Sequence, residues 1–180
     1  MANVSIRSAI KTDLARCLTL DPSYVTDFVW QMESRVHDGQ LAVNFRTAHL
    51  PRQMRVPYPR DHQLLTESWQ ACDAMLIAED ASGSLIGYAT LINRIPQATV
   101  LVNDLIVAKT ARRTGVGSAL LKASGQWGRE QRARWLMLEL QTKNYPAISF
   151  AQKHGLKFCG FNDHYFANQD IALFFALGLH

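Results

Sequence analysis

The sequence predicts a mixed α/β domain in which a β-sheet has helices packed against it. Short apolar runs with the two-residue period of strands fill much of the chain. A glycine turn joins one of these runs to an amphipathic helix, and a further strand–helix pair follows before two closing strands. A sheet covered by helices is the stable way to bury such a set of elements. The chain has 180 residues and neither repeats nor a Gly/Ser linker, so we expect one domain over 1–180.

The first half of the chain is expected to form two β-hairpins. Alternating side chains lie on both sides of Asp38-Gly39, so residues 24–32 and 41–45 are predicted to pair around that turn. A second hairpin is predicted from strands at 74–79 and 84–93, joined by a short polar turn. The remaining predicted elements of this half are a strand at 3–7, helices at 11–19 and 62–71, and a loop where Pro51, Pro57 and Pro59 break the pattern.

The second half is expected to alternate strands and helices. Residues 99–107 and 135–140 are apolar strands, and the second is so continuous that both of its faces should be covered. Between them, a helix begins near Val116 with apolar side chains at helical spacing. Gly125 and Gly128 would weaken this helix by roughly 1 kcal/mol each relative to alanine, so packing must hold it. The last predicted elements are a helix at about 145–154, capped by Asn144 and ended by Gly155, and strands near 157–161 and 170–176.

Composition excludes several classes of protein. The chain is 48% hydrophobic and 19% charged, which is ordinary for a globular domain. It has no run of 18 apolar residues and no signal-peptide core near its N-terminus, so we expect a cytoplasmic protein. Three cysteines, an odd number placed far apart, favour neither a disulfide framework nor a metal site. The six histidines have no metal-binding spacing, so no metal is expected.

The net charge of +4 suits either a nucleic-acid partner or a cofactor that carries several phosphates. The basic residues do not form one long run. Their densest pair, Arg112-Arg113, adjoins the glycine turn. This placement favours a phosphate ligand over a nucleic-acid groove.

The glycine turn has the features of an anion-binding site. Gly115 and Gly117 lie where a strand meets a helix, and the first backbone N–H groups of a helix have no partners inside it. The helix dipole adds positive potential there, and glycine lets a phosphate approach the backbone closely. The two arginines would add charge, and Thr114 and Ser118 would add hydroxyl donors. The motif is neither a Walker loop nor a complete GxGxxG, so a turn without any ligand is the alternative.

The segment Arg112 to Leu121 resembles the acetyl-CoA motif of the GNAT superfamily of N-acetyltransferases, R/Q-x-x-G-x-G/A followed by an apolar helix. Residues 104–107 resemble the strand before that motif, and 138–161 resemble the second half of the family. The segment ending at 170–175 is most similar to streptothricin acetyltransferases and, less closely, to acetyltransferases of ribosomal protein N-termini. The resemblance implies a mixed, mostly antiparallel sheet with helices on both faces.

The resemblance also implies how acetyl-CoA, the cosubstrate, would bind. Residues 101–180 would form its binding half, and 1–100 would carry the elements that shape the acceptor site. Strand residues Leu105, Ile106 and Val107 would lie along the pantetheine arm, with an N–H of this strand stabilising the oxyanion. Asn144 would contact the pantetheine side. The residues expected around the pyrophosphate are Arg112, Arg113, Thr114, Gly115, Val116, Gly117 and Ser118.

Acetyl transfer requires a neutral amine, so a base must accept a proton from the acceptor. Glu139 is the best candidate, because it is the one charged residue in an apolar strand, where an unused carboxylate would be costly. The resembling ribosomal-protein acetyltransferases have a glutamate at this place in Leu-Glu-Leu. The alternative is a structural ion pair with Arg46 or Lys109. Asp104 is a rival base in the neighbouring strand, although a turn-supporting or helix-capping role is the plainer interpretation.

One departure from the family concerns the general acid. Many relatives carry a tyrosine one residue after Phe150, and this chain has Ala151 there. Tyr145 or Tyr165 could substitute, Tyr165 being expected on the closing strands, or the thiol could leave without a dedicated acid. Tyr165 is therefore a catalytic candidate together with Glu139, and a packed tyrosine is the alternative.

Another candidate group is aromatic. Phe28, Trp30 and Met32 share one face of the first hairpin, where packing is a commoner use than a substrate cage. The sequence thus favours an acetyl-CoA-dependent N-acetyltransferase that acts on a primary amine, of a small antibiotic-like molecule in preference to a protein N-terminus. A degenerate acyl-CoA-binding module and a basic nucleic-acid-binding domain are the alternatives. The oligomeric state stays open, a homodimer included.

Overall fold

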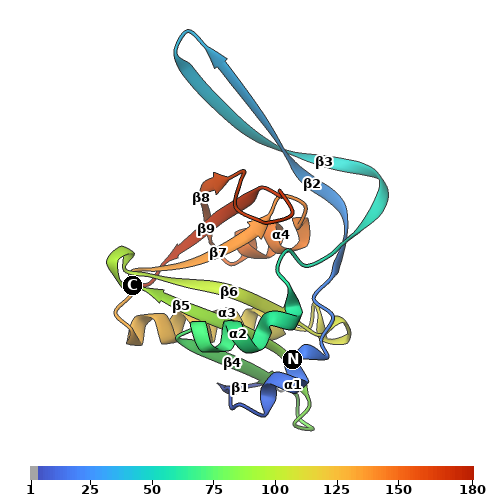
Figure 1. Ribbon diagram of the computed structural model, residues 1–180, viewed down its shortest axis with the longest axis vertical. Coiled ribbons are helices and arrows are strands. Elements are labelled where there is room, and N and C mark those ends of the chain that lie inside the picture. Colours follow the sequence, from blue (N-terminus) through green and yellow to red (C-terminus); the bar gives the residue numbers. More distant parts are fainter. Residues whose placement is uncertain (1–3) are drawn as a thin grey trace.

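A computed structural model describes residues 4–180 (Figure 1). Its centre is a seven-stranded sheet in the order β1-β4-β5-β6-β7-β9-β8. Only β6 and β7 run parallel among the described neighbouring strands. The strands of the sheet are β1 (Ser5–Ser8), β4 (Ala74–Glu79), β5 (Leu85–Arg94), β6 (Thr99–Val107), β7 (Trp135–Gln141), β8 (Lys157–Asn162) and β9 (Ala172–Gly178). The predicted mixed, mostly antiparallel sheet is confirmed.

Helices cover both faces of this sheet (Figure 1). The helices are α1 (Asp13–Leu18), α2 (Leu65–Ala71), α3 (Val116–Glu130) and α4 (Tyr145–Lys153), with single 3₁₀ turns at His62–Leu64, Ile95–Gln97 and Lys109–Ala111. The period of two in β4 divides its side chains between two cores. Met75 and Ile77 pack with α1 and α2, whereas Leu76 and Ala78 pack with α3.

The glycines of α3 allow the helix to approach the sheet closely. A Cβ on Gly128 would lie 2.8 Å from Leu179 and 3.5 Å from Val100. A Cβ on Gly87, in the facing strand β5, would lie 2.8 Å from the carbonyl oxygen of Ile106. Gly87 therefore requires glycine, because the obstructing atom is backbone, whereas at Gly128 the end of the Leu179 side chain would have to shift. The helix packs tightly on the sheet at its glycines, as expected for a helix of weak intrinsic propensity.

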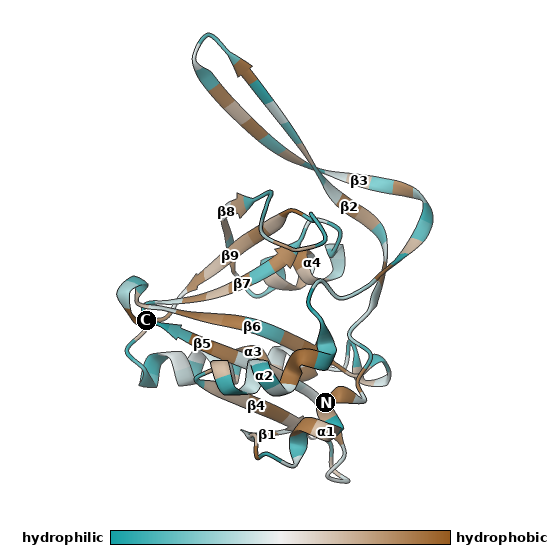
Figure 2. Cartoon of the chain, viewed as in Figure 1, coloured by the Kyte–Doolittle hydropathy of each residue, from teal (hydrophilic) through white to brown (hydrophobic). Residues whose placement is uncertain are grey.

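The first hairpin is longer than predicted and forms an arm. Its strands β2 (Tyr24–His37) and β3 (Gln40–Val56) make a separate two-stranded sheet that projects away from the body (Figure 1). Hydrophobic and hydrophilic residues alternate along it (Figure 2). The predicted loop at Pro51 is wrong, because β3 continues through this residue. The register between the strands shifts opposite Asp27, and such a bulge tolerates the missing N–H of proline.

The base of the arm is attached to the body. The N–H of Trp30 donates to the carbonyl of Thr142 at 2.9 Å. The Trp30 ring packs 5.9 Å from that of Phe175, between ring centroids, and also contacts Phe45 and Phe158. Packing, and not a substrate cage, is thus the observed role of Trp30, as the plainer interpretation held.

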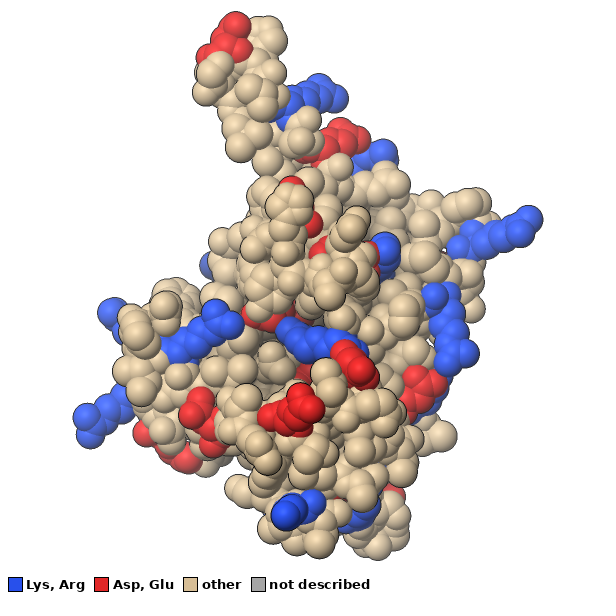
Figure 3. Space-filling view, in the orientation of Figure 1, with Lys and Arg blue, Asp and Glu red and all other residues tan. Residues whose placement is uncertain are grey.

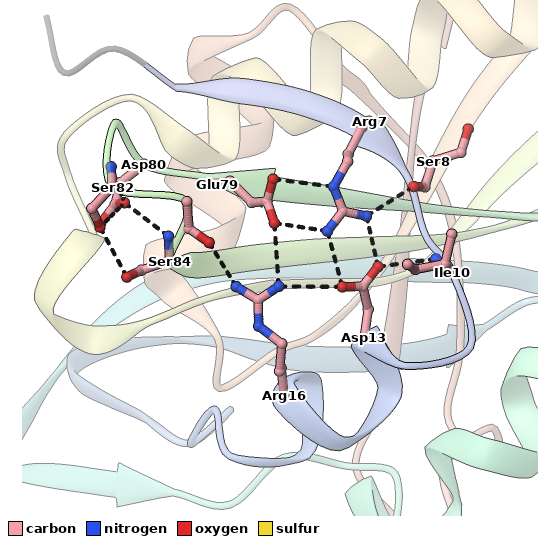
Figure 4. A network of polar contacts seen from close by, with 10 residues as sticks. Arg7, Ser8, Ile10, Asp13, Arg16, Glu79, Asp80, Ser82 and Ser84 are labelled. Atoms are coloured by element: carbon pink, nitrogen blue, oxygen red, sulfur yellow. Dashed lines mark hydrogen bonds and ion pairs between the residues drawn. The ribbon is translucent and has the colours of Figure 1, made fainter.

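A cluster of partly buried ion pairs lies at the opposite edge of the sheet (Figure 4). Arg7 on β1 contacts Asp13 of α1 at 2.6 Å and Glu79 of β4 at 2.7 Å. Arg16 reaches the same two carboxylates. The hydrogen bonds from Arg7 hold the pKa of the buried Asp13 carboxyl down at about 2. This cluster ties α1 to the sheet.

The other predicted elements lie within a few residues of their expected bounds. The strand predicted at 3–7 is β1, and residue 3 lies outside the described residues. The three cysteines are free. Within residues 4–180, every helix falls short of the length and apolar character needed to cross a bilayer.

Candidate active site

A cleft opens where β6 and β7 separate. The two strands pair only from Thr99 to Val102 on β6 and from Trp135 to Leu138 on β7. Beyond these pairs they diverge around a cavity of about 90 Å³. The residues that line it come from both strands, from α4 and from the loop before α2: Tyr58, Pro59, Arg60, Val102, Asn103, Leu105, Leu138, Glu139, Leu140, Gln141, Asn144, Ala147 and Phe150.

A β-bulge reshapes β6 at the mouth of this cleft. Thr90 of β5 pairs with Asp104 and Leu91 pairs with Val102, so Asn103 is the extra residue on β6. Bulges locally interrupt the ladder and re-aim the backbone. From this point β6 has β5 on one side and the cleft on the other, so its remaining backbone groups can face a ligand.

The glycine turn lies beside the cleft. Gly115 has φ 101° and Arg113 has φ 69°, so the backbone alternates in handedness before α3 begins. The first intrahelical bond runs from Ala119 to Gly115, and no described side chain caps the helix start. The N–H groups of the first turn are therefore available, as an anion requires. A Cβ on Gly117 would lie 3.4 Å from the ring of Phe150, which also lines the cleft.

The side chains around the turn hold it in place. Arg112 donates to the carbonyls of Val107 and Asp21, each at 3.1 Å, and burial lowers its pKa. The hydroxyl of Thr114 donates to Ala111 at 2.7 Å. The hydroxyl of Ser118 shares a 2.9 Å hydrogen bond with the ring of His154. Arg113 is exposed and forms no ion pair with a carboxylate of the described chain.

Asn144 connects the cleft to α4. Its side-chain oxygen accepts from the N–H of Ala147 at 3.1 Å, which confirms the predicted cap. The amide nitrogen of the same side chain is left to donate, and Asn144 lines the cavity.

Glu139 lies buried at the bottom of the cleft, on the part of β7 that has left β6. Its Oε2 accepts from Arg60 at 2.5 Å, and its Oε1 accepts from the hydroxyl of Tyr165. Arg94 lies 3.7 Å from Oε1. The predicted alternatives for its ion pair are wrong: Arg46 pairs with Glu33, and Lys109 pairs with Asp21.

Asp104 is also buried, but its oxygens are used by hydrogen bonds. Thr90 donates to it at 2.6 Å and Asn103 at 2.9 Å, and the hydroxyl of Tyr58 donates as well. Asp104 therefore neither supports a turn nor caps a helix, and the expectation that it would do so is wrong. Asp104 cross-links β6 to β5 and to the loop that carries Tyr58, because a buried carboxylate needs donors from whichever elements surround it.

Tyr165 lies in the loop between β8 and β9, not on the closing strands as predicted. Burial and the hydrogen bond to Glu139 raise its pKa, so its hydroxyl keeps its proton at neutral pH. Tyr145 packs 5.2 Å from Phe28, between ring centroids, and Ala151 is fully buried. The structure thus brings Tyr165 to Glu139, whereas Tyr145 packs on the arm.

Sequence reasoning missed three residues of this cluster, Tyr58, Arg60 and Arg94. Arg60 contacts Glu139, which lies 79 positions away. The only signal in the sequence is local: a tyrosine and an arginine alternate with two prolines in Pro57–Arg60, which predicts a stiff loop and no particular partner.

On the face drawn in Figure 3, acidic and basic side chains are interspersed. No group of metal-binding side chains occurs among residues 4–180.

Comparisons with known proteins agree with this geometry. The family model of the acetyltransferase (GNAT) family matches residues 44–156. The streptothricin acetyltransferase of Streptomyces lavendulae is 30% identical over 156 residues, covering 86% of this chain and 82% of the relative. The N-alpha-acetyltransferase of Sulfurisphaera tokodaii is 26% identical over 158 residues, covering 82% and 94%. The crystal structure of a nourseothricin acetyltransferase shares the fold with a TM-score of 0.84 at 23% identity, covering 98% of this chain and 99% of that one.

The cleft between diverging parallel strands, the glycine turn beside it and the family match lead to one assignment. The chain is an acetyl-CoA-dependent N-acetyltransferase that belongs to the acetyltransferase (GNAT) family.

Proposed function

We propose that the protein transfers an acetyl group to a primary amine of a small cationic molecule, and that streptothricin is the first acceptor to test. The observation that carries the proposal is the buried carboxylate of Glu139 in the cleft between β6 and β7. The relative that is 30% identical carries the name streptothricin acetyltransferase. A cationic amine suits a site whose base is an anion.

Acetyl-CoA fits the residues present. The N–H groups of residues 113–118 would hold the pyrophosphate, because this segment leads into the start of α3, where no described side chain caps the helix. The pantetheine arm would follow β6 along Leu105, Ile106 and Val107, where the strand has lost its partner β7. Asn144 would donate to it from the other wall. When bound, acetyl-CoA supplies an activated acetyl group at the point where the strands diverge.

The residues of the cleft would then move the protons. Glu139 would accept a proton from the acceptor ammonium, which is mostly charged at neutral pH because a lysine-type amine has a pKa of about 10.4. An N–H of β6 near the bulge would donate to the carbonyl oxygen as negative charge develops on it. Tyr165, which holds its proton at neutral pH, would donate toward the leaving sulfur.

An acceptor panel tests the proposal. Free thiol released from acetyl-CoA is measured with streptothricin, small diamines and a peptide that has a free N-terminus. Streptothricin is expected to give the highest kcat/KM. A higher value for the peptide would move the assignment to acetylation of protein N-termini, as the 26% identical relative suggests. A homodimer and a cytoplasmic location stay predictions, the first of which analytical ultracentrifugation can check.

A further inference from the structure

The cation that covers Glu139 comes from the chain itself. Nη2 of Arg60 lies 2.5 Å from Oε2 of Glu139, and Nη1 lies 3.9 Å from Oδ1 of Asp104. The guanidinium carbon lies 5.6 Å from the ring centroid of Phe166. Carboxylates and an aromatic face are the groups with which proteins hold ammonium and guanidinium ions. The pocket is therefore a cation site that an arginine already fills.

This pocket lies where an acceptor amine has to arrive. The side chain of Glu139 is 1% exposed, whereas that of Arg60 is 25% exposed and lines the cleft. An incoming molecule therefore reaches Arg60 before it reaches the carboxylate. An acceptor can contact Oε2 of Glu139 only when the guanidinium has moved.

The charges around the pocket favour such an exchange. With Arg60 in place, two carboxylates face two arginines, Arg60 and Arg94, and the cluster is neutral. Withdrawal of Arg60 leaves Glu139 and Asp104 with one cation, so the cluster becomes net negative. A net negative pocket shielded from water attracts a cation more strongly than an exposed surface does.

The side chain of Arg60 can leave without refolding its loop. Pro57 and Pro59 restrict the backbone on the N-terminal side, since proline fixes φ. Arginine itself has many rotamers and a long apolar stem. Its guanidinium can thus turn from the pocket toward solvent while the backbone stays in place.

We propose that Arg60 is a stand-in for the cationic acceptor: its guanidinium occupies the acceptor subsite beside Glu139, and the acceptor binds by displacing it. The inference rests on the proposed function, because it takes Glu139 as the base. The arriving ammonium replaces the guanidinium at Oε2 and gives one proton to that oxygen, and the freed amine lone pair attacks the acetyl carbonyl. The C–N bond forms as the C–S bond breaks, and the leaving thiolate takes a proton from the Tyr165 hydroxyl, which the second amine proton replaces. Weakly basic or neutral amines cannot compete for the carboxylate, so Arg60 selects for strongly cationic acceptors.

The rival role for Arg60 is to position the base, and it makes the opposite prediction. If Arg60 positions Glu139, its removal lowers kcat and leaves the acceptor KM unchanged or higher. If Arg60 occupies the subsite, its removal frees the subsite and lowers the acceptor KM. A subsite filled nine-tenths of the time reduces apparent affinity about tenfold, so Arg60→Ala should lower the KM for streptothricin by about that factor. The KM for acetyl-CoA should not change.

Methylguanidinium gives a test that needs no acceptor. Isothermal calorimetry should show that it binds Arg60→Ala, whose pocket is vacant, and not the wild-type protein. In turnover assays it should inhibit the variant competitively with streptothricin. Activation of Arg60→Ala by methylguanidinium would be rescue of a missing positioning group and would overturn the proposal, as would a raised acceptor KM or the absence of binding.

Two further variants complete the experiment. Arg46→Ala removes an exposed, ion-paired arginine of the arm and should match the wild-type protein in every measurement. Arg60→Lys keeps a cation if Arg60→Ala does not fold, and its KM for streptothricin should lie between those of the other two; a KM above the wild-type value overturns the proposal. If Glu139→Gln keeps its turnover while Arg60→Ala still binds methylguanidinium, the base assignment fails and the stand-in survives.

Discussion

Replacing Glu139 by glutamine tests the base assignment most directly. The substitution keeps the shape of the side chain and removes its ability to accept a proton. A positioned general base is worth about 10²–10⁴ in rate, so kcat at neutral pH should fall by that factor. The affinity for acetyl-CoA should barely change, because the glycine turn is held by its own contacts at Val107, Ala111 and His154.

The structural part of the effect can be worked out separately. Glutamine loses the charge-assisted bond from Arg60, a type of bond worth about 1.5–3 kcal/mol. The guanidinium can turn partly to water, so the net loss should be nearer to about 1 kcal/mol, which lowers Tm by about 2–4 °C in a chain of this size. A purely structural carboxylate would give this fall in Tm together with weakened acetyl-CoA binding, and only a proportionate loss of activity.

The assay combines thiol release, calorimetry of acetyl-CoA and thermal unfolding on the same purified variant. Activity of Glu139→Gln should recover partly as pH rises toward the pKa of the acceptor, since more of the amine is then already neutral. Glu33→Gln is the matched control, because it makes the same chemical change at an exposed, ion-paired carboxylate of the arm and should leave kcat unchanged. Near-normal kcat in Glu139→Gln at neutral pH would refute the reasoning and turn attention to Asp104.

Three more predictions concern the turn, the sheet and the ion pairs. Gly117→Asp should abolish the rise in Tm that acetyl-CoA causes, whereas Gly117→Ala should keep it, since a Cβ there meets only ordinary contacts at 3.4 Å or more. Gly87→Ala should cost about 1–3 kcal/mol in urea unfolding, because its Cβ would lie 2.8 Å from a backbone carbonyl of β6, and Gly160→Ala should cost much less. Asp13 has its pKa lowered to about 2 by Arg7, so its stabilisation is complete above about pH 4 and is lost as pH falls toward 2. Urea midpoints of the wild-type protein should therefore drop over that range more than those of Asp13→Asn do.

Local patterns predicted the parts of the site that one segment of chain forms alone. The known preferences of glycine at turns and of asparagine at helix starts were enough to predict the strand, turn and helix around Gly115 and Gly117 and the cap at Asn144. Periodicity also marked Glu139 as an unusual charge in an apolar strand. Each of these inferences needed fewer than ten consecutive residues.

The partners of those residues could not be predicted in the same way. Arg60 and Tyr58 come from a loop that only the tertiary fold brings to β6 and β7. Their identity depends on which loop reaches the opening, and no periodic pattern encodes that. At Pro51 a local rule gave a wrong prediction. Proline was expected to end the strand, but a bulge in the arm accommodates it and the strand continues.

The divergence of β6 from β7 has a consequence for how the domain unfolds. Only four residue pairs join the strands up to β6 to those from β7 onward, so the sheet is two blocks with a narrow seam. Helix α3 contacts strands on both sides of this seam and holds the blocks together. A ligand bound between the open ends of β6 and β7 would contact both strands and stabilise the two blocks relative to each other. Amides of residues 103–107 and 139–141 should then exchange hydrogen more slowly with acetyl-CoA bound, and the two blocks should lose their exchange protection together instead of one before the other.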